Sequence, residues 1–230
     1  MNVYYQGNEV TLGDGYRPLA GKKVLLIGDS NIAYFDSTLL VDTITSLTGC
    51  DSVGMNATAG AKWAAANGNT DTSITTMVGK VNTIVSHYED TGIADDYDVI
   101  AIMMGTNDAD SNIGDTIIST SATPDGTTMC GSMHYCLRKL LYYYREGTIV
   151  GIIPPQSEYS STRYERYAAM KQVYDYYSIP VLDFWGAGQV VANQKTENKR
   201  SSYLGDGIHF STNGRFQFMH KVSRFLETQV

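Results

Sequence analysis

The chain has 230 residues, of which 43% are hydrophobic and 18% are charged, a composition that suits one large globular domain. Its formal net charge of -7 gives no reason to expect nucleic-acid or anionic-membrane binding, because both need clustered lysine and arginine. The longest apolar runs are too short for a transmembrane helix, so we expect no membrane insertion.

The first seven residues lack the charged start and apolar middle of a signal peptide. Abundant tyrosine and glycine with few lysines favour an extracellular or surface-associated protein, although the sequence does not decide the location. The three cysteines, Cys50, Cys130 and Cys136, are an odd number without a repeating pattern. They predict no disulfide framework, and the redox compartment and oligomeric state stay open.

Strand-like and helix-like segments alternate from residue 22 onward. In chain order, the predicted elements are a strand at 23–27, a helix at 31–47, a weak strand at 51–55, a helix at 74–88, a strand at 98–104, a helix at 133–145, a strand at 148–153, a helix at 164–177, a strand at 179–182 and a helix at 213–226. Parallel strands need crossover connections, so this alternation predicts a parallel sheet with helices on both faces. The expected architecture is a three-layer α/β/α sandwich.

We expect two parts in the chain: a polar lead-in or linker at 1–21, in which an edge strand is an alternative, and one domain at 22–230. Within this domain, two long polar segments, 109–131 and 186–205, follow predicted strands. Ligands of open α/β sheets bind at the carboxyl ends of the strands. Both segments are therefore expected to border the binding crevice.

Three short motifs supply candidate chemistry at these strand ends. Gly28-Asp29-Ser30 ends the first predicted strand, and Gly105-Thr106-Asn107-Asp108 ends the third. A serine hydroxyl needs a neighbouring base to become a nucleophile. His209 is the candidate base, and Asp206, three residues earlier, is placed to orient its ring.

A tetrahedral intermediate also needs hydrogen-bond donors for its oxyanion, and the side-chain amide of Asn107 is a candidate. Each residue has a simpler alternative. Ser30 could only cap a helix, Asn107 could only form a turn, and His209 could only be a loop histidine after a plain turn at Asp206. The occurrence of all of them in one chain favours catalysis. For the adjacent Asp29 and Asp108 we expect hydrogen bonds to loop backbone.

Together with Gly60 in Asn56-Ala57-Thr58-Ala59-Gly60, these motifs resemble the four blocks of the SGNH hydrolases, the GDSL-type esterases. The resemblance spans about residues 22 to 225. It implies a flavodoxin-like parallel sheet of about five strands, Ser30 as nucleophile, and Asp206 and His209 as the remainder of a triad. It also implies an oxyanion hole formed by the N–H groups of Ser30 and Gly60 and the Asn107 amide, with the N–H of Ala59 or Ala61 as alternatives to Gly60.

The remaining candidate ligands fit structural roles better. His134 lies between Cys130 and Cys136, but the spacing matches no common zinc pattern and a fourth ligand is missing. We expect no metal and no cofactor. His87 near a helix end and His220 within the last helix are expected to be structural.

Aromatic residues lie close in sequence to the candidate motifs. Trp63, Trp185 and Tyr203 are either core residues or substrate-binding residues at the rim, where flat rings beside polar loops would suit sugar rings. A small basic cluster is either a solvated loop or a contact for an acidic sugar; it comprises Lys195, Lys199 and Arg200.

The sequence therefore predicts a serine esterase that removes a small acyl group, with acetyl favoured, from a carbohydrate, acting on a small-molecule or polysaccharide ester. A lysophospholipase or thioesterase acting on longer acyl chains is the alternative among enzymes. A non-catalytic carbohydrate-binding or virion-type structural module of the same fold is the alternative outside enzymes.

Overall fold

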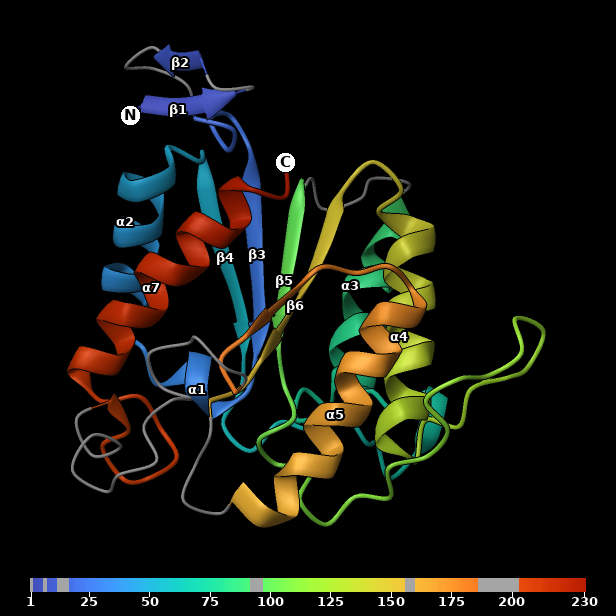
Figure 1. The fold of residues 1–230 in the computed structure, drawn as a ribbon. Coiled ribbons are helices and arrows are strands. Elements are labelled where there is room, and N and C mark those ends of the chain that lie inside the picture. Colours follow the sequence, from blue (N-terminus) through green and yellow to red (C-terminus); the bar gives the residue numbers. More distant parts are fainter. Residues whose placement is uncertain (1, 6–7, 12–16, 92–96, 156–159, 186–202) are drawn as a thin grey trace.

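The fold is known from a computed structural model, which describes residues 2–5, 8–11, 17–91, 97–155, 160–185 and 203–230. Five parallel strands form one sheet in the order β4-β3-β5-β6-β7 (Figure 1). Their bounds are β3 Lys23–Gly28, β4 Ser52–Ala57, β5 Val99–Met103, β6 Thr148–Ile153 and β7 Val181–Asp183. This strand order is that of the flavodoxin-like doubly wound folds, so the predicted sheet is confirmed.

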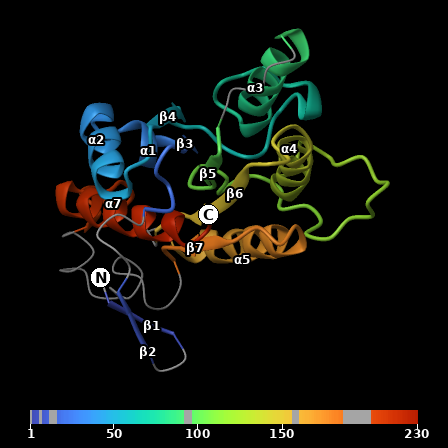
Figure 2. The same cartoon turned by 90° about the horizontal axis from the view of Figure 1, so that it is seen from above.

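Helices cover both faces of this sheet, as Figures 1 and 2 show. One face packs against α3, α4 and α5, and the other packs against α1, α2 and α7. Their bounds are α1 Ser30–Ala33, α2 Ser37–Thr48, α3 Met77–Thr91, α4 Met129–Tyr143, α5 Ser160–Tyr176 and α7 Thr212–Glu227, with a short 3-10 helix at Gly68–Thr70. The predicted three-layer sandwich is confirmed.

The core is divided between the two faces because successive side chains of a strand point to opposite sides. Leu25 and Ile27 of β3 join the cluster under α3, α4 and α5, whereas Val24 and Leu26 join the cluster under α1, α2 and α7. Every residue of β5 is buried. This double burial explains why the predicted strand at 98–104 reads as an unbroken apolar run.

The predicted single helix at 31–47 is wrong, because the structure has two helices there. α1 ends after Ala33, and α2 begins at Ser37 with Asp36 as its N-cap, whose carboxylate accepts a hydrogen bond from the Leu39 N–H at 3.1 Å. The apolar periodicity continues across the break, so periodicity alone did not reveal it. The break allows α1 to hold Ser30 in a short turn of helix at the carboxyl end of β3.

Two other boundaries differ from the expectation for capping reasons. α4 begins at Met129, four residues before the predicted start, because the Thr128 hydroxyl accepts a hydrogen bond from the Gly131 N–H at 3.1 Å. The lead-in contains two strands, β1 (Asn2–Tyr5) and β2 (Asn8–Thr11), which pair with each other in an antiparallel hairpin. They form a separate two-stranded sheet, near the amino end of β3 in Figure 1, and no edge of the main sheet.

Candidate functional site

The Gly28-Asp29-Ser30 turn joins β3 directly to α1. A side chain at Gly28 would place its Cβ 2.4 Å from Ile32 Cγ1, so the close approach of strand and helix requires glycine here. Asp29 is the N-cap of α1, and its carboxylate accepts a hydrogen bond from the Asn31 N–H at 2.9 Å. The cap is therefore Asp29, which leaves the hydroxyl of Ser30 available for another contact.

That contact is His209, which the structure brings to Ser30 from near the other end of the chain. His209 Nε2 lies 2.9 Å from Ser30 Oγ, and His209 Nδ1 lies 2.6 Å from Asp206 Oδ2. The other carboxylate oxygen of Asp206 accepts hydrogen bonds from the backbone N–H groups of Ile208 at 3.0 Å and His209 at 2.7 Å. Serine, imidazole and carboxylate thus form one hydrogen-bonded chain.

The carboxylate of this chain is held in its charged form. Partial burial works against ionisation of Asp206, but the hydrogen bonds from the backbone and ring of His209 and from the Ile208 N–H outweigh it and lower the pKa to about 2. Asp206 is therefore an anion at neutral pH. A fixed anion at Nδ1 leaves Nε2 of a neutral imidazole free to accept a proton from Ser30.

A tight turn at residues 58–61 follows β4 and is the next part of the site. The Ala61 N–H donates to Thr58 O at 3.1 Å, and Gly60 occupies the third position with a φ of +76°, the backbone region that a type II turn reserves for glycine. The Thr58 N–H donates to Gly28 O at 3.1 Å, so the turn is joined to the end of β3. The Ala61 N–H is already hydrogen-bonded within the turn, so it is unsuitable as the alternative to Gly60 as an oxyanion donor.

Asn107 reaches the same turn from the loop after β5. Its side-chain amide donates to Ala61 O at 2.8 Å. An amide nitrogen carries two N–H groups, and the second has no acceptor among the described residues. The turn and the loop thus place Gly60 and Asn107 at the same end of the sheet as Ser30, which follows β3 at the start of α1.

Two buried carboxylates hold these loops together. Asp108 accepts hydrogen bonds from the backbone N–H groups of Trp63 at 2.9 Å and Ala64 at 3.0 Å. Asp29 accepts one from the Thr106 N–H at 3.3 Å besides its helix-capping bond. The predicted role of Asp29 and Asp108 as acceptors for loop backbone is confirmed.

Burial has the largest effect on the pKa of both Asp29 and Asp108. It raises the pKa of Asp29 to about 6, although hydrogen bonds from Asn31 and Thr106 oppose the shift. It also raises the pKa of Asp108 above the usual range of a carboxyl group, against the hydrogen bonds from Ala64 and Trp63. The site is therefore framed by two carboxyl groups whose charge is costly, and each is stabilised by backbone donors.

The three predicted rim aromatics have different environments. Trp63 follows the core alternative and not the rim one: its side chain is fully buried in the core under α3, α4 and α5, with its ring 6.5 Å from that of Tyr174. Trp185 is half-buried, and its ring centroid lies 4.9 Å from that of Tyr167. Tyr203 is half-buried against the core on the α7 side.

Tyr34 is an aromatic neighbour of the site that sequence reasoning missed. Its side chain is 50% exposed, and its ring centroid lies 4.8 Å from that of His209. The signal was present in the sequence, because Tyr34 follows Ser30 by four residues and such a pair shares one face of a helix. The exposed ring therefore flanks the imidazole that contacts Ser30.

The candidate metal ligands His134, Cys50, Cys130 and Cys136 are all buried. His134 is fully buried, and its Nδ1 lies 2.9 Å from the Tyr177 hydroxyl. Cys50, Cys130 and Cys136 are all buried free thiols. Among the described residues, no three histidine, cysteine, aspartate or glutamate side chains gather in a group able to hold a metal ion.

Four predictions concern residues for which the structure gives no side-chain position, and a fifth concerns His220. Lys195, Lys199 and Arg200 lie outside the described residues, and so does the side chain of His87. His220 is half-buried on α7, with its ring 4.9 Å from that of Phe216. None of the helices in the described ranges is both long and apolar enough to span a membrane.

Comparisons with known proteins identify solved structures that share this fold. No protein-family model and no curated protein sequence matches the chain. A protein from Lactobacillus plantarum superposes with a TM-score of 0.66 at 19% identity, covering 92% of this chain and 99% of that one. A member of the lipolytic protein G-D-S-L family from Veillonella parvula gives 0.55 at 13% identity, covering 88% and 97%.

A third similar structure is a carbohydrate acetylesterase family member from Sinorhizobium meliloti. It superposes with a TM-score of 0.53 at 14% identity, and the match covers 90% of this chain and 98% of that one. These likenesses extend over nearly the whole of both chains. This chain has the fold of the SGNH hydrolases.

Proposed function

We propose that this protein is a serine esterase that hydrolyses a small acyl ester, with acetyl the favoured group, on a carbohydrate. One observation carries the proposal: Ser30 Oγ, the His209 ring and the Asp206 carboxylate form a continuous chain with contacts of 2.9 and 2.6 Å. Nucleophile, base and orienting anion in this order are what acyl transfer through a serine requires. The reaction needs no metal or cofactor.

In the first half of the proposed reaction, Ser30 Oγ attacks the ester carbonyl while His209 Nε2 takes its proton. The Asp206 carboxylate stabilises the imidazolium that forms. The N–H groups of Ser30 and Gly60 and the Asn107 amide donate to the oxyanion of the tetrahedral intermediate. His209 then protonates the leaving alcohol, and the acyl group stays on Ser30.

In the second half, His209 removes a proton from a water molecule, which attacks the acyl-serine carbonyl. The oxyanion forms at the same donors, and its collapse returns the proton to Ser30 and releases the carboxylic acid. Preorganisation of the donors supports this cycle. Asn107 is anchored on Ala61 by one N–H, so its position does not have to be established during the reaction.

Aromatic and polar groups near the site support a sugar as the alcohol part. His209 must face the leaving-group oxygen when it donates its proton, and the exposed ring of Tyr34 lies 4.8 Å from the His209 ring. A flat, half-exposed ring gives a pyranose an apolar face to pack on while its hydroxyls remain hydrated. One structure of the same fold is described as a carbohydrate acetylesterase family member.

A cavity of about 540 Å³ beyond the carboxyl end of β7 also supports this substrate class. Asp183 is fixed there by Lys171 Nζ at 2.6 Å and by the Trp185 N–H at 2.9 Å. The cavity combines aromatic rings with paired charges, and its lining is Tyr164, Tyr167, Ala168, Lys171, Gln172, Asp183 and Trp185. This combination offers a ligand both flat apolar surfaces and hydrogen-bonding groups.

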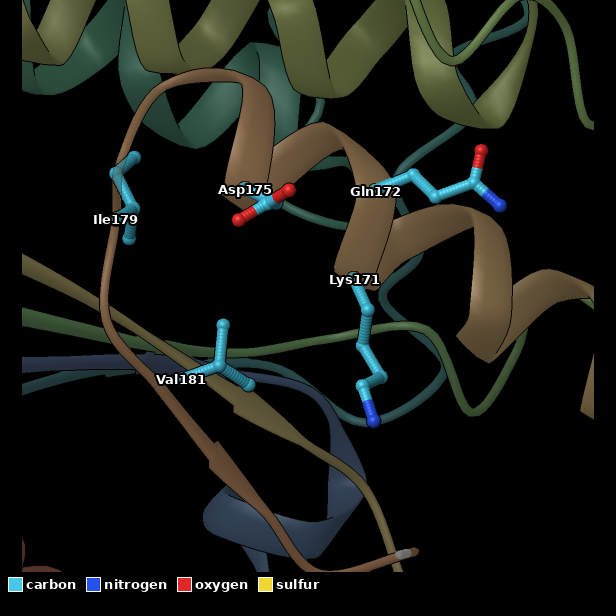
Figure 3. A pocket seen from close by; sticks show the side chains of 5 residues that line it. All are labelled: Lys171, Gln172, Asp175, Ile179 and Val181. Atoms are coloured by element: carbon cyan, nitrogen blue, oxygen red, sulfur yellow. The ribbon is translucent and has the colours of Figure 1, made fainter.

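A second cavity of about 400 Å³ continues along α5 and shares Lys171 and Gln172 with the first. Figure 3 shows it between α5 and β7, with Asp175 and Lys171 on the helix side and Val181 on the strand side. Two adjoining cavities along one helix offer room for more than one sugar unit.

The test is hydrolysis of p-nitrophenyl esters from acetate to octanoate and of acetylated methyl glycosides, with wild type, Ser30→Ala and the exposed control Ser86→Ala. We expect acetate to be the best ester, Ser86→Ala to match wild type, and Ser30→Ala to lose activity. Rates that rise toward octanoate would favour a lysophospholipase or thioesterase. No turnover together with no labelling of Ser30 by a fluorophosphonate would favour the non-catalytic module.

A further inference from the structure

Lys80 is a fully buried cation that the proposed reaction does not use. It lies on α3 and is 1% exposed, and its ammonium donates to Asn56 Oδ1 at 2.9 Å and to Thr58 Oγ1 at 2.8 Å. Both acceptors are neutral, and no carboxylate of the described residues forms an ion pair with Lys80. Burial lowers its pKa to about 8, so the ammonium form still prevails at neutral pH.

This arrangement is costly for stability. A buried charge without a counter-ion loses hydration that two neutral acceptors only partly replace. A methionine would fill a similar volume at this position without that loss. Packing alone therefore gives no reason for a lysine here, and the position of its ammonium is the informative feature.

The ammonium contacts the first residue of the turn that carries Gly60. Thr58 begins this turn, and Asn107 holds its last residue through the bond to Ala61 O at 2.8 Å. Lys80 and Asn107 therefore hold the two ends of the turn by hydrogen bonds, Lys80 at Thr58 and Asn107 at Ala61. Between them lies Gly60, with open space on the side where a Cβ would point.

Lys80 also contacts the strand that precedes the turn, β4, through Asn56. Asn56 is a residue of β4 and pairs in register with Ile27 of β3, two residues before Asp29. One ammonium thus ties α3 to the last part of β4 and to the turn that follows it. A shift of this segment would move Gly60 relative to Ser30, because both follow the paired ends of β3 and β4.

We propose that Lys80 is a positioning residue that, through its bonds to Thr58 and Asn56, holds the turn at 58–61 so that the Gly60 N–H faces the developing oxyanion. This inference rests on the proposed function, because it assigns Gly60 to the oxyanion hole. Loss of one such donor costs roughly 100-fold to 1,000-fold in kcat. Displacing the donor without removing it is expected to cost about 10-fold to 100-fold.

The primary test compares Lys80→Met with Lys139→Met. Lys139 is a matched control, since its ammonium also donates to an asparagine side chain, Asn82 Oδ1 at 3.0 Å, but lies on α4 away from the turn. We expect Lys80→Met to lower kcat on p-nitrophenyl acetate at least 10-fold with KM within threefold of wild type. The thermal unfolding midpoint is expected to stay the same or rise, because the uncompensated charge is gone.

Binding of ethylboronic acid supplies a readout that a merely structural role would not change selectively. It forms a tetrahedral adduct with an activated serine and places an oxygen where the oxyanion would lie. Its inhibition constant is expected to weaken in Lys80→Met by the same factor as kcat, while the KM of the ground-state ester holds. A kcat and inhibition constant equal to those of Lys139→Met would overturn the inference.

Thr58→Val keeps the test decisive if Lys80→Met does not fold. It removes the Thr58 acceptor and retains the lysine, and we expect a parallel loss in kcat and boronate affinity. The double variant should lose no more than Lys80→Met alone, because the two side chains act through one contact. A Thr58→Val protein with wild-type constants would overturn the inference, whereas a wild type that neither hydrolyses esters nor binds the boronate would overturn the proposed function with it.

Discussion

Replacement of Asp206 by asparagine isolates the role of the carboxylate in the Ser30–His209–Asp206 chain. The substitution preserves size and keeps one acceptor oxygen. In the structure, one carboxylate oxygen accepts from the backbone N–H groups of Ile208 and His209, and the other lies 2.6 Å from His209 Nδ1. An asparagine oxygen that keeps the two backbone bonds places its NH₂ group against Nδ1.

That NH₂ group donates to Nδ1 and so selects the imidazole tautomer with its proton on Nε2. This tautomer cannot accept the proton of Ser30, which lies 2.9 Å from Nε2. In serine hydrolases that use such a triad, the wrong tautomer costs about 10⁴ in kcat, or about 5 kcal/mol of barrier. We expect a loss of roughly 10³ to 10⁴ in kcat on p-nitrophenyl acetate, with little change in KM.

Stability is expected to change little, because the Asp206 side chain is 58% exposed. Asp125→Asn is the matched control, since Asp125 is also exposed and accepts hydrogen bonds from the Thr127 N–H at 3.0 Å and hydroxyl at 2.7 Å, in a turn before α4. Steady-state kinetics of both variants are the assay. An Asp206→Asn enzyme within threefold of Asp125→Asn would refute the assignment of Asp206 as the orienting anion.

Three further predictions concern the leaving-group side, the core and the buried carboxylate. Tyr34→Leu should lower the ratio of kcat/KM for an acetylated glycoside to that for ethyl acetate by about threefold to tenfold, the worth of one aromatic contact; an unchanged ratio would remove Tyr34 from substrate binding. Phe218→Ala should destabilise the protein by about 3–5 kcal/mol in urea unfolding, because Phe218 is fully buried and stacks on Phe184; a loss below about 1 kcal/mol would contradict this packing. Asp29 has a folded pKa of about 6 against an ordinary 3.8, so the folded state holds its proton up to a higher pH than the unfolded state does. The free energy of unfolding should therefore fall by up to about 3 kcal/mol as pH rises from about 4 to 6. Urea unfolding of Asp29→Asn across this range should lack this part of the pH dependence, and a pH dependence identical to that of the wild type would refute the shift.

The strands and the reacting groups were predictable because their signals are local and strong. The predicted strand at 148–153 coincides with β6, since buried parallel strands are continuous apolar runs. Ser30 and His209 were predicted as partners although 179 positions separate them. Their connection follows from topology, because the carboxyl ends of parallel strands meet at one edge of the sheet.

Other features depend on contacts that no local pattern encodes. The break at Asp36 was missed because apolar spacing continues across it, and only the cap on the Leu39 N–H ends one helix and starts the next. The choice between core and rim for Trp63 stayed open in the sequence because a loop has no periodicity to separate buried from exposed positions; its burial follows from packing against α5. Lys80 gave no sequence signal, since its partners Asn56 and Thr58 reach it only after α3 packs beside β4.

The central claim is that Ser30 becomes covalently acylated during turnover. The most direct measurement is peptide mass spectrometry of the wild type after acid quenching of its reaction with p-nitrophenyl acetate, with Asp206→Asn and Ser30→Ala in parallel. The account predicts an acetyl group on the peptide containing Ser30 in the wild type, a slower build-up in Asp206→Asn and none in Ser30→Ala. Ester hydrolysis by a Ser30→Ala protein at the wild-type rate, with no acetyl group on Ser30 of the wild type, would contradict it.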